Sequence, residues 1–222
     1  MKHVGRSSEE AGGEVPGRDR SEQLQPVDPP EPRTAMLRDG TPLVIRPLRP
    51  TDREALALGY AELSDESRRR RFFSAPKRLS ASLLDYLTDL DFDQRFAWVA
   101  HLRDDPDQRG LGVARWVRLR EDPTRAEAAV TVADDWQGRG LGTQLLLALI
   151  DAASERGITT FVADVLWENK TLLEPLRQLG ARVAASEPGM ARVEFDLPRS
   201  ETELAASAVH RMLVEAAVAA SH

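Results

Sequence analysis

Cysteine is absent from this chain of 222 residues. Its absence excludes disulfide bonds, thiolate nucleophiles and metal sites built on thiolates. The four histidines, His3, His101, His210 and His222, are scattered and lack the close spacing of metal ligands. We therefore expect no bound metal ion.

Long hydrophobic runs are also missing. No stretch approaches the roughly 20 apolar residues that a membrane-spanning helix needs, and the N-terminus lacks the apolar core of a signal peptide. The formal net charge of -6 argues against bulk attraction to nucleic acid or to an anionic membrane surface. We expect a cytoplasmic protein with neither a nucleic acid nor a membrane as its partner.

Composition divides the chain into three parts. Residues 1–35 are rich in Gly, Pro, Ser, Glu and Arg and poor in large apolar residues, so they are predicted to form a disordered N-terminal tail. Residues 36–199 carry the patterns of one folded domain. The alanine-rich residues 200–222 predict a final helix.

Local patterns predict the order of elements within the folded domain. Strands are expected at residues 43–48, 96–102, 111–119, 125–133, 159–166, 182–186 and 192–197. Helices are expected to begin near Thr51, Ser64 and Ser80, and to cover residues 142–157 and 169–179. This order favours an α/β (α+β) fold, a mixed and mostly antiparallel sheet with helices on both faces.

The segment Gly138-Arg139-Gly140-Leu141-Gly142 joins a predicted strand to the clearest predicted helix. Amides at the start of a helix have no intrahelical partner, and the helix dipole makes that end partly positive. Glycines let the backbone approach a phosphate closely. The segment therefore predicts a site for a phosphorylated cofactor.

Two common phosphate loops do not match this segment. Gly138 and Gly142 are too close together for a P-loop, and no lysine follows them. The dinucleotide fingerprint would need its third glycine one residue later and belongs near the start of a parallel sheet. Here several predicted strands come first.

The segment instead resembles the acetyl-CoA-binding motif [QR]-x-x-G-x-[GA] of the GNAT superfamily of N-acetyltransferases, with Gln137, Gly140 and Gly142 at its fixed positions. A second similarity runs from Asn169 and Leu172 to Leu179 and Gly180, which resembles the family's N-x-x-[AL]…LG segment. In element order the resemblance extends from about residue 44 to residue 197.

An earlier stretch is similar to one branch of this family. Residues 63–68, followed by 71–73, resemble the N-terminal segment of bacterial Pat-type protein lysine acetyltransferases. The resemblance implies transfer of an acetyl group from acetyl-CoA to a primary amine, with a protein lysine as the acceptor, by a monomer or homodimer. A small amine such as an antibiotic or polyamine is the enzymatic alternative, and a non-catalytic acyl-CoA sensor is an alternative of another class.

The resemblance also implies which residues hold the cofactor. Gln137 belongs to the motif, and the pyrophosphate would be cradled by the amides of Gly138, Arg139, Gly140, Leu141, Gly142 and Thr143. The pantetheine arm would lie along the strand edge of Val130, Thr131 and Val132. Asn169 would cap the next helix or bind the pantetheine arm.

A neutral amine is needed for acyl transfer, and a lysine with a pKa of about 10.4 is almost fully protonated at pH 7. The resemblance implies Glu127 as the general base, with a solvated strand position as the alternative. Asp164 is the second candidate, with a structural hydrogen-bonding role as its alternative. Many family members place a tyrosine acid where this chain has Leu176.

Four consecutive arginines, residues 68–71, lie on a predicted helix. We interpret them as a solvated helix face. The functional alternative is attraction of the cofactor's 3′-phosphate or of an acidic protein substrate.

Overall fold

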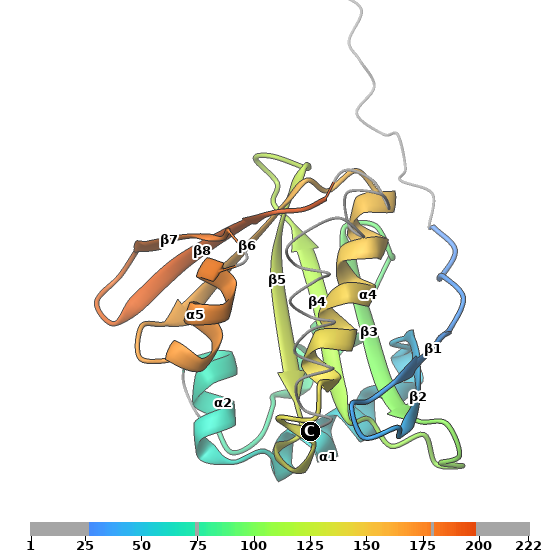
Figure 1. Cartoon of the computed structure of the whole chain (residues 1–222). Coiled ribbons are helices and arrows are strands. Elements are labelled where there is room, and N and C mark those ends of the chain that lie inside the picture. The colour runs from blue at the N-terminus through green and yellow to red at the C-terminus, as the bar shows by residue number, and fades with distance from the viewer. Residues whose placement is uncertain (1–26, 74–75, 179, 199–222) are drawn as a thin grey trace, which may run out of the picture.

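The computed structural model describes residues 27–73, 76–178 and 180–198 (Figure 1). The predicted C-terminal helix and most of the predicted N-terminal tail lie outside these residues. Within the described ranges, no helix has both the length and the apolar character needed to cross a membrane.

One sheet runs through the described part of the chain, with the strand order β1-β2-β3-β4-β5-β6-β8-β7. Its strands are β1 (Arg33–Met36), β2 (Pro42–Pro47), β3 (Arg95–Leu102), β4 (Gly112–Arg118), β5 (Arg125–Val132), β6 (Thr160–Leu166), β7 (Arg182–Ala185) and β8 (Met190–Asp196). Only β5 and β6 pair in parallel, and the other neighbours pair antiparallel. The predicted mixed, mostly antiparallel sheet is confirmed.

The strand β1 is a correction to the sequence analysis. It pairs with β2 from Arg33 to Met36, so regular structure begins inside the last residues of the predicted tail. The segment has only four residues, two of them polar, and its pairing with β2 is a contact that composition does not reveal.

The helices of the described residues are η1 (Pro50–Asp52), α1 (Arg53–Glu62), α2 (Asp65–Phe72), α3 (Ala81–Thr88), η2 (Asp134–Trp136), α4 (Leu141–Glu155) and α5 (Lys170–Gln178). Two of them begin at the predicted serines. The Ser64 hydroxyl accepts a hydrogen bond from the Ser67 amide, and the Ser80 hydroxyl accepts one from the Leu83 amide. Such caps satisfy amides that the helix itself leaves unpaired.

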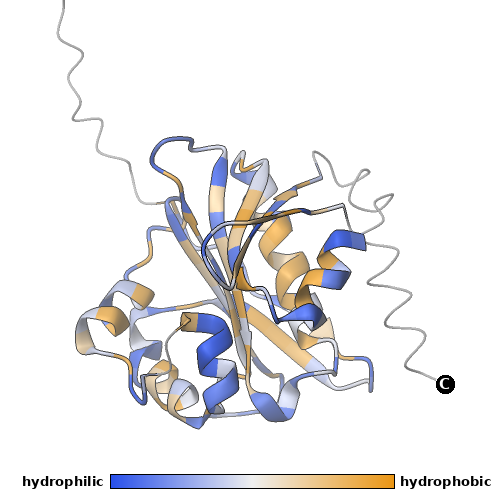
Figure 2. Ribbon diagram, turned by 90° about the vertical axis from the view of Figure 1, so that its left-hand side faces the viewer, coloured by the Kyte–Doolittle hydropathy of each residue, from blue (hydrophilic) through white to orange (hydrophobic). Residues whose placement is uncertain are grey.

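The main core lies between the sheet and α4, where Figure 2 shows hydrophobic residues gathered in the strands and the long helix. Leu145 and Leu149 of α4 are fully buried. The indole N–H of Trp98 on β3 donates to the Ala148 carbonyl of α4 at 3.1 Å. Because strand side chains alternate, the residues next to Trp98 point to the opposite face, where α1 and α2 lie.

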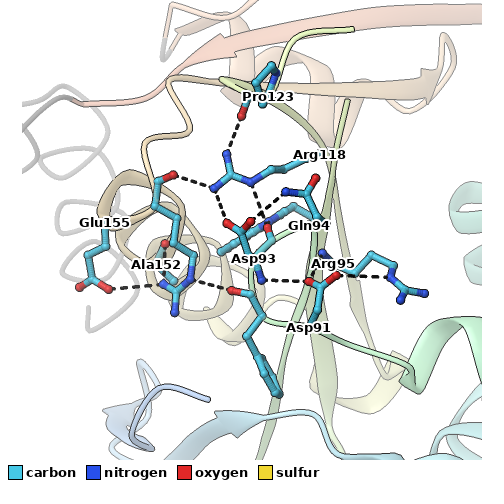
Figure 3. Close-up of polar contacts among 11 residues, drawn as sticks. Asp91, Asp93, Gln94, Arg95, Arg118, Pro123, Ala152 and Glu155 are labelled. Carbon is cyan, nitrogen blue, oxygen red and sulfur yellow. Dashed lines mark hydrogen bonds and ion pairs between the residues drawn. The ribbon is translucent and has the colours of Figure 1, made fainter. Parts of the chain in front are cut away.

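A polar network fixes the C-terminal end of α4 (Figure 3). The buried Arg118 guanidinium donates to the Asp93 carboxylate at 2.8 Å and to the Arg156 carbonyl at 2.6 Å. The Arg156 guanidinium in turn donates to the Phe92 carbonyl at 2.8 Å. Charge-assisted hydrogen bonds of this kind are among the strong ones in proteins. They join β4 and the residues before β3 to the C-terminal end of α4. The N-terminal end of α4 follows the glycine-rich segment.

Candidate active site

The strands β5 and β6 pair over three residues and then separate (Figure 1). Arg125, Ala126 and Glu127 have partners on β6, and β6 pairs with β8 along its other edge over its whole length. From residue 128 to Val132, β5 keeps β4 on one side and, among the described strands, has no partner on the other. The predicted pantetheine-binding residues Val130, Thr131 and Val132 lie on this open edge, which is suited to an extended ligand with amide groups.

The glycine loop, residues 137–142, sits where the open edge ends. Gly138 and Gly140 have φ values of 74° and 91°, which residues with a side chain rarely adopt. Within the described chain, no acceptor receives a hydrogen bond from the amides of residues 138–143. Because α4 begins at Leu141, these amides form the positive end of a fifteen-residue helix. The amides that the sequence analysis assigned to the pyrophosphate therefore lie unpaired at the start of a helix.

The side chain of Arg139 braces this loop. Its guanidinium forms an ion pair with Asp39 and lies 4.2 Å from the centre of the Trp136 ring. Hydrogen bonds from Thr41 and Arg139 hold the pKa of the Asp39 carboxyl at about 2. Arg139 therefore offers the loop its backbone amide, and its side chain ties the loop to the turn between β1 and β2.

Gln137 also has a bracing side chain. Its amide nitrogen donates to the Val132 carbonyl at 3.2 Å, to the Asp134 carboxylate at 3.1 Å and to the Ser67 hydroxyl at 3.1 Å. Val132 ends β5 and Ser67 belongs to α2. This motif residue therefore joins the open strand, the glycine loop and α2.

Glu127 lies at the point where β5 and β6 part. Its side chain is exposed and, among the described residues, makes no hydrogen bond or ion pair. Ala126 and Ala128 face the α4 core, so the alternation of the strand places Glu127 on the face of α2. A free carboxylate here is available to accept a proton.

The second candidate base has a partner. The Asp164 carboxylate accepts a hydrogen bond from the Arg192 guanidinium of β8 at 2.9 Å. This ion pair favours the structural role that the sequence left open for Asp164.

The last predicted residues lie on and beside α5. Asn169 comes directly before α5, and its carbonyl accepts a hydrogen bond from the Leu173 amide at 3.0 Å. Leu176 packs against the main core, so an apolar side chain occupies the position where the resemblance implies a tyrosine acid.

A cavity of about 490 Å³ lies between the sheet and the helices α1 and α2. We call it the α1–α2 cavity. Side chains of β3, β4 and β5 line it, including Val99, Arg115 and Thr131, and Tyr60 and Phe72 belong to its helical wall. Its volume suits a side chain or a small molecule.

Arg115 was missed by the sequence analysis, although it is only 6% exposed and lines this cavity. Both terminal nitrogens of its guanidinium are buried and make no hydrogen bond. Burial lowers the pKa of Arg115 to about 10, and the like charge of Arg71 acts in the same direction, whereas Tyr86 and Glu127 partly offset it. The sequence signal was an arginine between the apolar residues Ala114 and Trp116 of a strand.

The arginine run at 68–71 is not one solvated face, which corrects our interpretation. Arg68 is buried and donates to the Leu63 carbonyl at 2.6 Å. Arg71 lines the α1–α2 cavity, where burial lowers its pKa and the charge of Glu127 opposes that effect. Arg69 and Arg70 lie on the exposed side and pair with Glu66 and Glu168, and Arg68 also pairs with Asp65.

The sheet, the free amides and the open strand edge together define an acetyltransferase of the GNAT type. A family profile described as "Acetyltransferase (GNAT) domain" matches residues 42–182. The chain belongs to this family, whose members use acetyl-CoA as co-substrate. The predicted resemblance is confirmed, and at the level of the family so is the class of acetyl-CoA-dependent N-acetyltransferase.

Two relatives of known name are similar to the chain. The "Acetyltransferase Pat" of Mycolicibacterium smegmatis is 37% identical over 175 residues, which cover 77% of this chain and 50% of that protein. The "Acetyltransferase PA5475" of Pseudomonas aeruginosa is 41% identical over 121 residues, covering 54% of this chain and 64% of that protein. The chain thus spans half to two thirds of the length of these relatives.

A solved structure supports the same assignment. The GNAT domain of S. lividans PAT superposes with a TM-score of 0.69 at 33% identity, covering 75% of this chain and 97% of that one. The fold class predicted from the sequence is therefore confirmed by an independent structure.

Proposed function

We propose that this protein transfers an acetyl group from acetyl-CoA to the side-chain amine of a protein lysine. The observation that carries the proposal is the set of unpartnered amides at residues 138–143, placed beside the open edge of β5. The similarity to Pat proteins supports lysine as the acceptor. We expect the enzyme to act in the cytoplasm as a monomer or homodimer.

Cofactor binding would follow the geometry of the glycine loop. The amides of residues 138–143 would donate to the pyrophosphate, each hydrogen bond to a charged group contributing about 1.5–3 kcal/mol. The pantetheine arm would pair with the edge of Val130 and Val132, beside Thr131, and approach Asn169 from the gap between β5 and β6. The thioester would then lie near Glu127, where the two strands part.

The chemistry would be direct transfer within a ternary complex. Glu127 removes a proton from the lysine ammonium, directly or through one water, and the neutral nitrogen attacks the thioester carbonyl carbon. The new C–N bond forms as the C–S bond breaks, and the nitrogen then gives its second surplus proton to water. Because Leu176 cannot donate a proton, coenzyme A would leave as a thiolate, which is tolerable for a thiol with a pKa of about 8–9.

The proposal is tested by measuring thiol release from acetyl-CoA in the presence of a whole-cell lysate, followed by mass spectrometry of the proteins. Release that depends on enzyme, with new acetyl-lysines, is the expected result. A panel of small amines run in parallel checks the enzymatic alternative. Binding of acetyl-CoA by calorimetry without thiol release from any acceptor would instead identify the non-catalytic sensor.

A further inference from the structure

The guanidinium of Arg115 is a buried cation without an ionic partner. Its two terminal nitrogens have no hydrogen-bond acceptor within the described structure, and the ring of Tyr86, with its centre 5.3 Å away, gives it an aromatic contact. A buried charge without a partner is expensive to maintain. With a pKa of about 10 the group stays protonated at neutral pH.

A second cation lies on the same cavity. Arg71, from the end of α2, lines the α1–α2 cavity with Arg115, and each is close enough to influence the charge of the other. Its guanidinium makes no ion pair with a described residue and stacks on the Phe72 ring at 4.7 Å. The cavity therefore offers two positive groups and an empty volume in front of them.

We propose that Arg115, together with Arg71, binds a carboxylate that the acceptor carries close to its reacting amine. This inference rests on the proposed acyl transfer and narrows its substrate class. Guanidinium groups match carboxylates because their planar N–H donors form two parallel hydrogen bonds. A bound carboxylate would supply the acceptors that Arg115 lacks.

The register of the strands places this carboxylate site beside the proposed base. Arg115 of β4 pairs with Ala129 of β5, which follows Glu127 by two residues on the same face. Two residues along a strand correspond to roughly 7 Å. An amine held at Glu127 and a carboxylate held at Arg115 therefore belong to one small amino acid or to neighbouring residues of one peptide.

The positive charges of Arg71 and Arg115 disfavour polycationic small amines as acceptors. Polyamines and aminoglycoside-like antibiotics carry several positive groups, which Arg71 and Arg115 would repel at short range. The cavity wall also carries five acidic residues, Asp52, Glu62, Asp105, Asp134 and Asp135. Asp52 is bound to Arg46 and Glu62 is paired with Arg109, and no carboxylate lies within ion-pair distance of the Arg115 nitrogens, so the repulsion acts at Arg115 itself.

The test compares matched acceptors with and without the carboxylate. The acceptors are lysine peptides with a flanking Glu or Gln, and free amino acids with their amides. We expect the wild type to favour the carboxylate by at least about tenfold in kcat/KM through a lower KM, because charge-assisted hydrogen bonds to the guanidinium would be gained. Arg115→Gln should abolish the preference and retain acetyl-CoA affinity.

Arg109→Gln is the control. Arg109 lines the same cavity, but its side chain is 68% exposed and already paired with Glu62. This variant should keep the preference. Acetylation without any preference would overturn the inference and leave the proposed function intact. An equal loss of kcat for all acceptors in Arg115→Gln would also overturn it, because Arg115 would then serve only to position Glu127.

Two further measurements separate this inference from the proposed function. If no acceptor is acetylated, the proposed function is wrong. The carboxylate site is then tested separately by titrating the protein with glutamate and following its arginine Nε NMR signals. Saturable shifts that Arg115→Gln abolishes would support the carboxylate site, and their absence would overturn it. If Arg115→Gln instead removes a preference for succinyl-CoA over acetyl-CoA, the carboxylate comes from the donor and the assignment to the acceptor is wrong.

Discussion

The Asp134 carboxylate accepts a hydrogen bond from the Ser64 amide at 2.6 Å, across 70 residues of chain. It also accepts one from the Ser67 hydroxyl at 2.6 Å. One acidic side chain after β5 therefore holds the first turn of α2. The other end of α2 carries Arg71, so this contact helps to place a cavity arginine.

Replacing this carboxylate should loosen α2. Burial alone would raise the pKa of Asp134, but hydrogen bonds from Ser67 and Ser64 outweigh it and lower the pKa. We expect Asp134→Asn to reduce the free energy of unfolding by about 0.5–1.5 kcal/mol, measured by urea denaturation, because the exposed Ser64 and the half-buried Ser67 lose their charged acceptor. The neighbouring Asp135→Asn, at an exposed position, should change it little. Equal effects of the two variants would contradict this account.

Glu127→Gln tests the proposed base. Turnover should fall by roughly 10²-fold or more, because the amide cannot take the proton from the amine. The dissociation constant for acetyl-CoA, measured by calorimetry, should stay unchanged. Glu121→Gln, at an exposed position away from the site, should keep full activity. Unchanged turnover in Glu127→Gln would assign the proton transfer to another group.

Gly140→Ala should damage cofactor binding. The φ of +91° disfavours any side chain, and a Cβ atom would lie 3.1 Å from Cγ of Arg38. A strained φ of this kind costs about 1–2 kcal/mol, so we expect the dissociation constant for acetyl-CoA to rise about tenfold.

A glycine elsewhere provides the matched control for this strain. Gly189 has a φ of +80° in the turn between β7 and β8, and a Cβ atom there meets nothing within 4 Å. Gly189→Ala should lower stability without changing acetyl-CoA affinity. If both variants bind acetyl-CoA as the wild type does, the shape of the glycine loop is not what holds the cofactor.

The contact between Asp39 and Arg139 should depend on pH in a defined direction. The pKa of Asp39 is lowered to about 2 by Thr41 and Arg139, so its contribution is complete above the ordinary pKa near 4 and is lost as the pH falls toward 2. Asp39→Asn should therefore melt at a lower temperature than the wild type at pH 7, and the two should converge near pH 2. High salt should shrink the difference at pH 7, because the pair is exposed. A difference that persists at pH 2 would rule out the ion pair as its cause.

Local signals in the sequence were enough to predict much of this fold. Hydrophobic alternation, two serine caps and the glycine loop each act within a few residues, and all of them are found in the structure. The parting of β5 and β6 after Glu127 could not be predicted, because it depends on how the whole sheet is arranged and leaves no signal in the neighbouring residues. Arg115 was missed for a similar reason, because the cavity that it lines is built by α1, α2 and four strands together.

The three residue pairs between β5 and β6 leave β6, β7 and β8 attached to the rest of the sheet by a narrow seam. A cofactor bound in the gap beyond Glu127 would contact both parts of the sheet. By mass action, a ligand at 1,000 times its dissociation constant stabilises the folded state by about 4 kcal/mol. Hydrogen exchange in β8 should slow when acetyl-CoA is added. The concentration of acetyl-CoA would then set the local stability of β6, β7 and β8. The protein would resist unfolding most when its cofactor is bound.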